Sequence, residues 1–392
     1  MAAELKNTDC GTRGGALLDV YSHIQYPFEL VRGEGVHVWD AAGNKYLDFY
    51  GGHCVCCLGH SPREVADAIA AQAKELLFYS NLAPMPVREK AADKLIQFAA
   101  NGFTKVFFCN SGGEANENAL KIAIKATGRQ KIAAFKGAFH GRTLLALGAT
   151  DNAKWHGQYA GWVGEVERFE PNTAESLAQI DGQTAAVILE PIQSIGGCTV
   201  FEPDYLRALK EACDKHGALL IYDEVQTGMG RTGSPFVSGH WAVLPHMATL
   251  AKGLAGGFPI GAVMMTREVA DSISPGDIAA TFGGGPLAMA AMGATVCCLK
   301  KYNLVGHAAE IEHYVRRKFT VSQVTEIRGK GCLLGLVLDR EAKPVQQALF
   351  KKGIITGLNS NPHLLHLLPP LTIQFEHVDL LHQALIEVLK AA

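Results

Sequence analysis

The chain contains 392 residues, of which 48% are hydrophobic and 19% are charged, and its formal net charge is −2 at pH 7. This length accommodates one large domain and a smaller one, and the composition is typical of a globular protein with a substantial core. The near-neutral charge, without a basic stripe, argues against a nucleic-acid partner, and no apolar run approaches the roughly 18 residues of a membrane span.

The N-terminus and the cysteines indicate the compartment. Met1–Gly15 is polar and mixed in charge, and it lacks an apolar stretch followed by a small-residue cleavage site. The ten cysteines are scattered through the chain among apolar neighbours, which favours reduced thiols over a disulfide framework. We therefore expect a soluble, cytoplasmic protein.

One cysteine cluster resembles a metal-binding motif. Cys54, Cys56 and Cys57 lie between His53 and His60. A structural zinc site would require a second pair of ligands at regular spacing, and none is visible. We therefore expect no metal, and we interpret the cluster as small side chains packed beneath a binding pocket.

The first elements are an arm, a hairpin and two helices. Residues 17–32 are expected to form the arm, and alternating apolar residues predict a hairpin over Gly35–Phe49. A helix over Pro62–Leu77 should begin at Ser61 as its N-cap, with Glu64 in capping-box position. A second helix is predicted over Val87–Ala100.

A glycine-containing turn follows the next strand. Val106–Cys109 is predicted to be buried, and Asn110–Glu114 leads directly into a helix that ends near Lys125. Backbone N–H groups at a helix N-terminus, together with the helix dipole, favour an anion. Ser111, Gly112 and Gly113 are our candidate phosphate site. Alone, an ordinary strand-to-helix turn explains the pattern equally well.

Strands and helices then alternate. Strands are predicted over Lys131–Phe135 and Ala185–Leu189, the latter ending at Glu190, and a helix covers about residues 204–216. Continuous apolar strands are typical of a parallel sheet with both faces covered. The pattern predicts an α/β fold with a doubly wound, mostly parallel sheet.

Two further strands end at an acid and at an amine. An apolar run from Leu219 stops at Asp223, and the run from Met247 to Ala251 is followed by Lys252. Parallel strands present such residues at one edge of the sheet. A lysine for covalent attachment, an aspartate for a ring nitrogen and a phosphate site are what pyridoxal 5'-phosphate requires.

After about residue 300 the character of the chain changes. A helix is followed by two short strands over Val324–Leu338, a helix over Val345–Lys352, a strand, and a terminal helix over Val378–Lys390. We expect residues 1–54 and 300–392 to build a smaller α+β domain and residues 55–299 to form the large domain.

The motifs DEVQTGMGRTG and AKGLAGGFPIGA together resemble those of the class III pyridoxal-phosphate aminotransferases. FCNSGGEANENALK and HLLPPLTI are similar to the acetylornithine and succinylornithine aminotransferase group. The resemblance implies a fold type I homodimer. It also implies transfer of the distal amino group of an N-acylated ornithine, or a related ω-amino compound, to 2-oxoglutarate in arginine biosynthesis, giving a semialdehyde and glutamate.

The resemblance also implies roles at the cofactor. Lys252 would attach to it and move a proton as base and acid, and Asp223 would hold its ring nitrogen. Phe139 and Val225 would cover opposite faces of the ring, and Gln226 would lie near its phenolic oxygen. Offset stacking makes the role of Phe139 physically sensible, although core packing is the alternative.

Two further residues are carried over, one as a partner of the substrate and one as a partner of the neighbouring subunit, and two glutamates are considered beside them. Arg142 would grip a substrate carboxylate through two parallel hydrogen bonds, with a surface ion pair as the alternative. Thr281 would reach the phosphate of the neighbouring subunit's cofactor. Glu190 is a candidate acid near the substrate, and Glu224 is expected to make a structural contact.

Two positions depart from the family pattern. Ile195 stands where relatives have a glutamate, and His366 stands where they have an arginine. In relatives this glutamate and this arginine form a switchable ion pair. Losing both is physically coherent, because one unpaired buried charge would cost on the order of 3–5 kcal/mol. We expect the donor to present its carboxylate differently or to lack one near the reacting amine. His366 would then offer at most a weaker, pH-dependent contact.

Several alternatives stay open. A transaminase for diamines, other ω-amines or 4-aminobutyrate would share the same motifs, and so would an aminomutase or decarboxylase on the same fold. A non-catalytic binding protein is disfavoured, because the lysine, the aspartate, the aromatic residue and the phosphate turn are all present.

Overall fold

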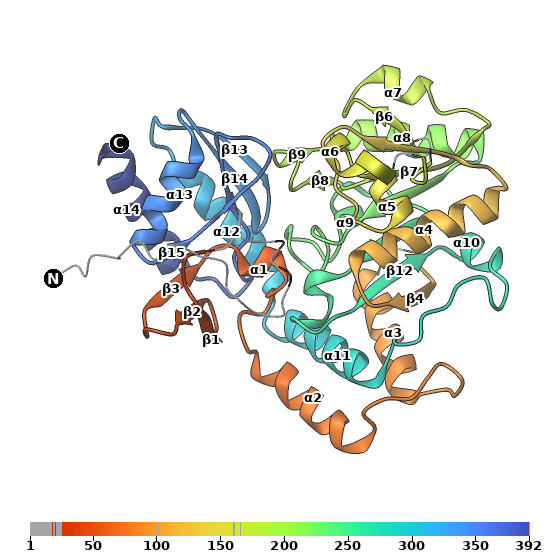
Figure 1. Ribbon diagram of the computed structural model, residues 1–392, viewed down its shortest axis with the longest axis horizontal. Coiled ribbons are helices and arrows are strands. Elements are labelled where there is room, and N and C mark those ends of the chain that lie inside the picture. The colour runs from red at the N-terminus through yellow and green to blue at the C-terminus, as the bar shows by residue number, and fades with distance from the viewer. Residues whose placement is uncertain are drawn as a thin grey trace.

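The computed structural model describes Leu18, Val20 and residues 26–100, 102–159, 161–164 and 166–391 (Figure 1). The N-terminal segment 1–15 lies outside this part of the chain, and so do residues 17, 19 and 21–25 of the arm predicted over residues 17–32. None of the helices found within it combines the length and the apolar character that a membrane crossing requires.

A seven-stranded sheet forms the centre of the larger lobe. Its order is β4 (Lys105–Cys109), β12 (Gly261–Met265), β11 (Met247–Leu250), β10 (Leu219–Asp223), β7 (Thr184–Leu189), β5 (Lys131–Phe135) and β6 (Val166–Phe169). Only β12 runs antiparallel to its neighbours. The predicted doubly wound, mostly parallel sheet is confirmed, although β12 was not predicted.

Helices cover both faces of this sheet. On one face α4 (Gly112–Thr127) packs over Ile132, Ile188 and Ile221. On the other, α8 (Pro203–His216) packs over Val187, Leu220 and Tyr222. Because neighbouring residues of one strand face opposite helix layers, every position of β7 and nearly every position of β10 is buried.

Further helices and two short strands complete the large lobe. They are α2 (Arg63–Glu75), α3 (Pro86–Ala99), α5 (Leu144–Ala149), α6 (Ala153–His156), η1 (Gly157–Tyr159), α7 (Ala174–Ala178), β8 (Ile192–Gln193), β9 (Thr199–Val200), α9 (Val237–Trp241), η2 (Lys252–Ala255), α10 (Arg267–Asp271) and α11 (Pro286–Lys301).

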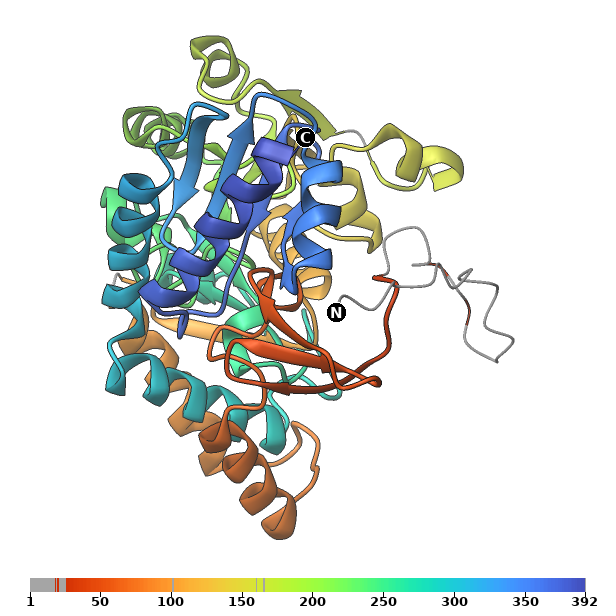
Figure 2. The same cartoon turned by 90° about the vertical axis from the view of Figure 1, so that its left-hand side faces the viewer.

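The smaller lobe joins the two ends of the chain (Figure 2). The predicted hairpin is β2 (His37–Asp40) and β3 (Lys45–Asp48), and β3 pairs with β15 (Ile354–Ile355) from the C-terminal part. A second sheet contains β13 (Val324–Lys330), β14 (Leu333–Leu338), β17 (Leu364–Leu367) and β16 (Gly357–Leu358). It packs with α12 (Leu304–Lys318), α13 (Ala342–Lys351) and α14 (Phe375–Ala391).

The N-terminal hairpin and the C-terminal part of the chain are therefore in direct contact. One continuous apolar cluster extends from Val36 in the hairpin through Leu250 in the central sheet to Leu385 in α14. Helix α11 also continues to Lys301, across the expected boundary. The division into 1–54, 55–299 and 300–392 therefore remains a proposal.

Two local predictions are wrong. Residues 30–32 belong to strand β1 (Leu30–Glu34), which pairs with β2, rather than to an arm. Ser61 does not cap α2: it adopts a left-handed conformation with φ of 51°, and Pro62 is the N-cap residue. The carbonyl of Pro62 accepts the first helical hydrogen bonds, so the serine hydroxyl is displaced from the capping position.

Gly261, at the start of β12, packs directly on the predicted phosphate turn. A Cβ atom there would lie 2.2 Å from the carbonyl oxygen of Ser111. We expect Gly261→Ala to lower the free energy of unfolding by about 1–3 kcal/mol or more, because the backbone must move. Chemical denaturation measures this. Gly182→Ala is the matched control, since no atom lies within 4 Å of its Cβ position, and equal effects of the two substitutions would contradict the packing argument.

Candidate active site

A cavity of about 320 Å³ opens at the carboxyl edge of the central sheet. It brings together most of the residues predicted from the sequence. From the predicted cofactor set, it is lined by Ser111, Gly112, Gly113, Phe139, Val225 and Gln226. Asp223, Lys252 and Glu190 line it as well. A cavity of this size matches those that bind small ligands.

Asp223 is held by three donors. It ends β10 and is 3% exposed. Asn116 Nδ2 donates to its Oδ2 at 2.7 Å, His140 Nδ1 donates to the same oxygen at 2.8 Å, and the backbone N–H of Val225 donates to Oδ1 at 3.0 Å. A carboxylate offers about four acceptor positions, so one remains for a group in the cavity.

Sequence reasoning missed Asn116 and His140. Asn116 Oδ1 accepts a hydrogen bond from Thr249 Oγ1 at 2.6 Å, and Thr249 pairs with Asp223 across β10 and β11. These contacts orient the amide so that its nitrogen points to Asp223. The available signal was weak: Asn116 is a polar residue on the buried stripe of α4, and His140 follows the predicted Phe139.

The candidate phosphate turn is closely packed. Ser111 is the N-cap of α4, and its Oγ accepts the N–H of Glu114 at 3.2 Å. A Cβ atom on Gly112 would lie 2.9 Å from Val225 Cγ1, so glycine permits the turn to approach Val225, two residues after Asp223. The turn, the helix N-terminus and the acid therefore share one cavity.

Lys252 follows β11 in a strained conformation. Its φ is 46°, a region that non-glycine residues rarely occupy. Among the described residues its Nζ makes no hydrogen bond or ion pair. Cys57 Sγ donates to the carbonyl of Gly253 at 3.2 Å and supports this turn from below. An amine without a partner in a cavity is available for covalent chemistry.

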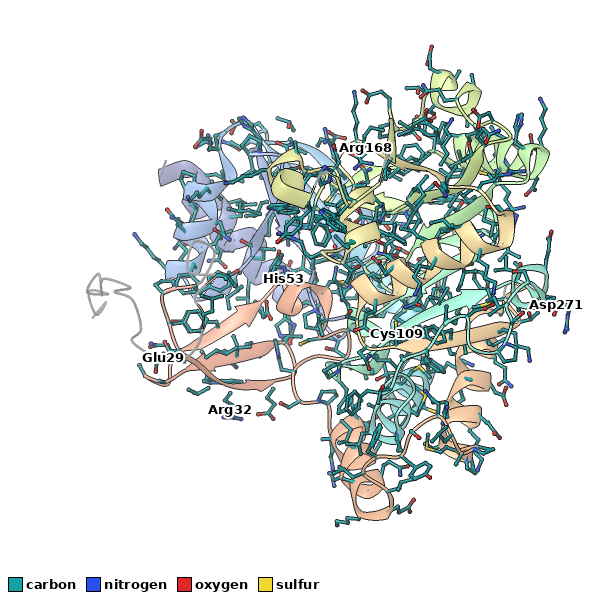
Figure 3. The ribbon with its side chains drawn as sticks, turned by 45° about the vertical axis from the view of Figure 1, so that its right-hand side comes forward. Glu29, Arg32, His53, Cys109, Arg168 and Asp271 are labelled. Carbon is teal, nitrogen blue, oxygen red and sulfur yellow. The ribbon has the colours of Figure 1, made fainter. Side chains whose placement is uncertain are left out.

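The cysteine cluster packs beneath the site. Residues 51–54 all have positive φ and form a left-handed turn, α1 (Gly51–Cys54), next to the cavity. Cys54 Sγ contacts the carbonyl oxygen of Gln226 at 3.6 Å, and His53 Nδ1 lies 2.9 Å from Tyr50 Oη. Figure 3 places His53 between the two lobes. Across the described residues, no group of three or more potential ligands is arranged for a metal.

Two buried glutamates have raised pKa values. Glu190 Oε1 accepts the backbone N–H of Phe139 at 2.8 Å. Burial raises the pKa of Glu190 to about 7, His140 opposes the shift and Asp223 adds to it. Burial likewise raises the pKa of Glu224 to about 7. Its two oxygens accept Thr227 Oγ1 and the N–H of Val237, and it does not line the cavity, which supports a structural role.

Three predicted residues lie outside the cavity lining. Arg142 is exposed, and its guanidinium carbon lies 3.5 Å from the centroid of the Trp155 ring. Thr281 is exposed beside Phe282. His366 is 2% exposed, and its Nε2 lies 3.2 Å from Ser194 Oγ.

Neither of the two sequence departures places a charged side chain in the cavity lining. Ile195 lines the cavity and is 39% exposed. Burial lowers the pKa of His366 to about 3, and Lys252 adds to the shift. This shift favours the neutral imidazole near pH 7 and argues against the pH-dependent contact expected of His366.

The arrangement fits pyridoxal phosphate. The free acceptor position of Asp223 suits a protonated ring nitrogen, the Lys252 amine has no partner, and the turn at α4 suits a phosphate. The side-chain oxygen of Gln226 is buried without a partner among the described residues, so a polar ligand is expected there.

Known proteins agree with this reading. Residues 20–389 match the family model of the class III aminotransferases. An acetylornithine aminotransferase from Methanopyrus kandleri is 40% identical over 96% of this chain and 98% of its own length. One from Aquifex aeolicus is 38% identical over 94% of this chain and 98% of its own.

Solved structures show the same architecture. The ornithine aminotransferase of Toxoplasma gondii superposes with a TM-score of 0.88 and 30% identity, covering 95% of this chain and 93% of that one. The N-acetylornithine aminotransferase of Stenotrophomonas maltophilia gives 0.82 and 32%, covering 96% and 99%. A PLP-bound amine transaminase from an uncultivated Pseudomonas species gives 0.87 and 28%, covering 95% and 97%.

The raised pKa of Glu190 predicts a pH-dependent stability difference. Between pH 5 and pH 7 Glu190 is mostly ionised in the unfolded chain, whereas the folded chain holds the proton until the pH approaches its pKa of about 7, so this residue destabilises the fold as pH rises. Glu190→Gln should therefore gain about 2 kcal/mol relative to the unmodified chain from pH 5 to pH 7, as measured by urea denaturation.

The exposed Glu211 on α8 provides the matched control, Glu211→Gln, for which we expect no such change. A stability difference for Glu190→Gln that is constant across this pH range would contradict a protonated, buried Glu190.

Proposed function

Because this chain belongs to the class III aminotransferases, we propose that it transfers the distal amino group of an N-acylated ornithine to 2-oxoglutarate, giving a semialdehyde and glutamate. As a member of this family the protein is an aminotransferase of the pyridoxal-phosphate-dependent fold type I class. The acetylornithine aminotransferases similar to it over nearly its whole length support the proposed substrate.

The observation that carries the proposal is the placement of Asp223 and Lys252. Asp223 ends β10 and Lys252 follows the paired strand β11, and both line one cavity with the N-terminal turn of α4. A binding protein on this scaffold would not require a strained lysine with an unpartnered amine. The geometry therefore favours catalysis.

This chain's residues divide the binding of the cofactor among them. Lys252 would hold it covalently through Nζ, and Ser111, Gly112 and Gly113 would hold its phosphate. Asp223 would accept the N–H of the ring nitrogen. Phe139 and Val225 would enclose the ring, and Gln226 would meet its phenolic oxygen.

The proton transfers fall to Lys252. When bound, pyridoxal phosphate supplies an electron sink for the pair released as the donor carbon loses its proton. Lys252 Nζ would accept that proton as a base and then donate it again as an acid. Asp223 keeps the ring nitrogen protonated, and Asn116 and His140 keep Asp223 oriented.

The substrate carboxylate is assigned to Arg142. Among the described residues Arg142 makes no hydrogen bond or ion pair, so all of its N–H groups remain available. Glu190, whose pKa is raised to about 7 by burial, is a candidate donor toward the substrate in its protonated form. His366 would act as a neutral hydrogen-bonding group beside Ser194.

The homodimer is also part of the proposal. Phe282 is 64% exposed, and its ring lies 5.0 Å from that of Phe78, which is 39% exposed. Such a paired apolar surface beside Thr281 is suited to burial against a second copy. Thr281 would then reach the partner's phosphate site. Sedimentation of the purified protein as a monomer at micromolar concentration would contradict this.

We also propose that the protein is cytoplasmic.

One observation favours a second candidate. Ile195 lines the cavity where relatives carry a charged residue, and the neutral His366 provides no cation nearby. Donors without a carboxylate near the reacting amine, such as diamines, would suit this wall. A transaminase for such amines is therefore the alternative function.

A donor panel distinguishes the two candidates. We expect N-acetylornithine or N-succinylornithine to form glutamate from 2-oxoglutarate with kcat/KM at least about tenfold above that of 1,4-diaminobutane, because Arg142 can bind the carboxylate that the diamine lacks. Glutamate formation measures this. Reaction of carboxylate-free amines alone would contradict the acylornithine assignment.

A half reaction supplies the control for reaction type. Incubation with donor alone should convert the bound cofactor to its amine form, which absorbs at shorter wavelength. A mutase or decarboxylase would leave the cofactor spectrum as it was at the start.

A further inference from the structure

Trp155 links two residues of the candidate site without lining the cavity itself. Its ring is perpendicular to that of Phe139, at 83° and a centroid distance of 5.7 Å. The guanidinium carbon of Arg142 lies 3.5 Å from its ring centroid. We call Phe139, Trp155 and Arg142 the aromatic–cation column.

The column restrains the side chain of Arg142, which makes no hydrogen bond or ion pair among the described residues. An exposed arginine loses considerable rotamer entropy when a ligand fixes it. The indole face attracts the guanidinium and already restricts its position. Because stacking uses the flat face of Arg142, the N–H groups on its edge stay free for a carboxylate. Part of the cost of ordering Arg142 is therefore met before substrate binds.

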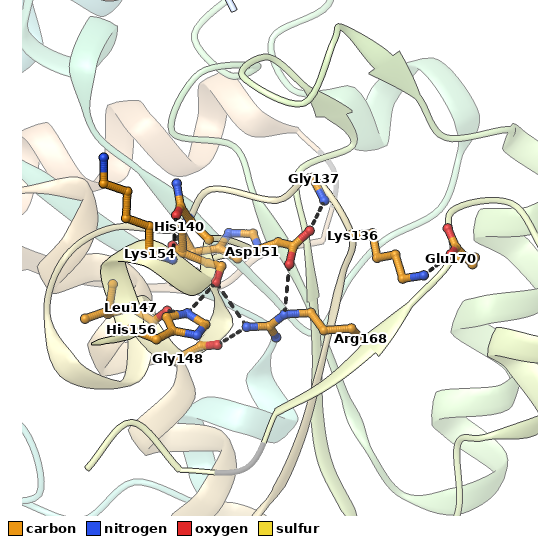
Figure 4. Close-up of polar contacts among 12 residues, drawn as sticks. Lys136, Gly137, His140, Leu147, Gly148, Asp151, Lys154, His156, Arg168 and Glu170 are labelled. Atoms are coloured by element: carbon orange, nitrogen blue, oxygen red, sulfur yellow. Dashed lines mark hydrogen bonds and ion pairs between the residues drawn. The ribbon is translucent and has the colours of Figure 1, made fainter. Parts of the chain in front are cut away.

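Helix α6, which carries Trp155, is held firmly at both ends. Asn152 caps it, and its Oδ1 accepts the N–H of Lys154 at 3.1 Å. At the other end His156 Nε2 donates to the carbonyls of Leu147 and Thr150 at 2.9 and 2.8 Å. Figure 4 shows this arrangement. Four residues of helix are too short to be stable alone, so these contacts fix the position of Trp155.

The same network reaches the loop that carries Phe139. Asp151 Oδ2 accepts the N–H of Gly137 at 2.8 Å, and the N–H of Asp151 donates to the carbonyl of Ala138 at 2.8 Å. Arg168 binds the carbonyls of Gly148 and Thr150 and pairs with Asp151 (Figure 4). The loop before Phe139 and the helix that carries Trp155 are thus parts of one rigid unit.

We propose that Trp155 is a positioning residue for substrate recognition: it holds the Arg142 guanidinium ready for the carboxylate of the amino donor and ties it to the cofactor wall through Phe139. The proposal rests on the proposed function, since it assigns the carboxylate to Arg142. It selects donors that carry a carboxylate remote from the reacting amine.

The test measures binding as well as turnover. N-acetylnorvaline has the skeleton of N-acetylornithine without the distal amine, so it binds without reacting. Calorimetry with the cofactor-loaded enzyme should show about five- to tenfold weaker binding for Trp155→Ala, the scale expected for losing one stacked cation and its preorganisation. Trp155→Phe should lie between, and it keeps the measurement possible if the alanine variant folds poorly.

A double-mutant cycle separates positioning from general damage. Trp155→Ala should weaken binding no further when Arg142→Ala is already present. The KM for N-acetylornithine should rise in Trp155→Ala by a similar factor at unchanged kcat, whereas turnover of 1,4-diaminobutane should stay within about twofold. Trp162, which is 76% exposed, provides the matched control Trp162→Ala, with no expected effect.

Several outcomes would overturn the proposal. They are unchanged binding in Trp155→Ala, an equal loss in the Arg142→Ala background, or an equal loss of turnover for donors with and without a carboxylate. If the unmodified enzyme binds no N-acetylnorvaline and accepts only the diamine, the proposed function itself is wrong and the assignment of Trp155 falls with it.

Discussion

The parallel pairing of β10 with β11 is the constraint on which the site depends. In this register Asp223 lies opposite Thr249, and Lys252 follows three residues later. Backbone hydrogen bonds of the sheet therefore set the separation of the acid and the amine. Because both strands are buried on both faces, slippage by one residue would move apolar side chains into the wrong helix layer. Sheet packing and site geometry are thus specified by the same residues.

The buried charge of Asp223 explains the residues around it. A carboxylate that is 3% exposed is costly unless donors surround it. Asn116, His140 and the N–H of Val225 supply three hydrogen bonds, and no lysine or arginine contacts it within the described residues. One acceptor position is left toward the cavity. A protonated ring nitrogen would complete this shell, so the protein's own electrostatics favour the cofactor form that catalysis requires.

The sequence specified the central features of the site because each follows from a local pattern. Asp223 and Lys252 come at the ends of apolar runs, and Ser111–Gly113 joins a strand to a helix. The boundaries of these strands and of this helix could therefore be predicted to within a few residues. Contacts between distant segments were not accessible in this way. Asn116 depends on how α4 lies over β11, and Trp155 depends on a short helix fixed by side-chain contacts. The pairing of β3 with β15 joins residues far apart in the chain.

Local prediction also failed where competing interactions decide. Ser61 has the chemistry of an N-cap, but its left-handed backbone leaves that position to Pro62. For His366, the sequence gives a titratable group and only the fold shows that burial keeps it neutral. The identity of a residue therefore predicted its possible chemistry, whereas its environment determined which chemistry is available.

Reductive trapping of the cofactor tests the central claim most directly. The purified protein is incubated with pyridoxal phosphate, reduced with borohydride and digested, and the modified peptide is identified by mass spectrometry. The account predicts one modified residue, Lys252, and no modification in Lys252→Ala under the same conditions. Stoichiometric modification of a different lysine in the unmodified protein, or retention of the label in Lys252→Ala, would contradict it.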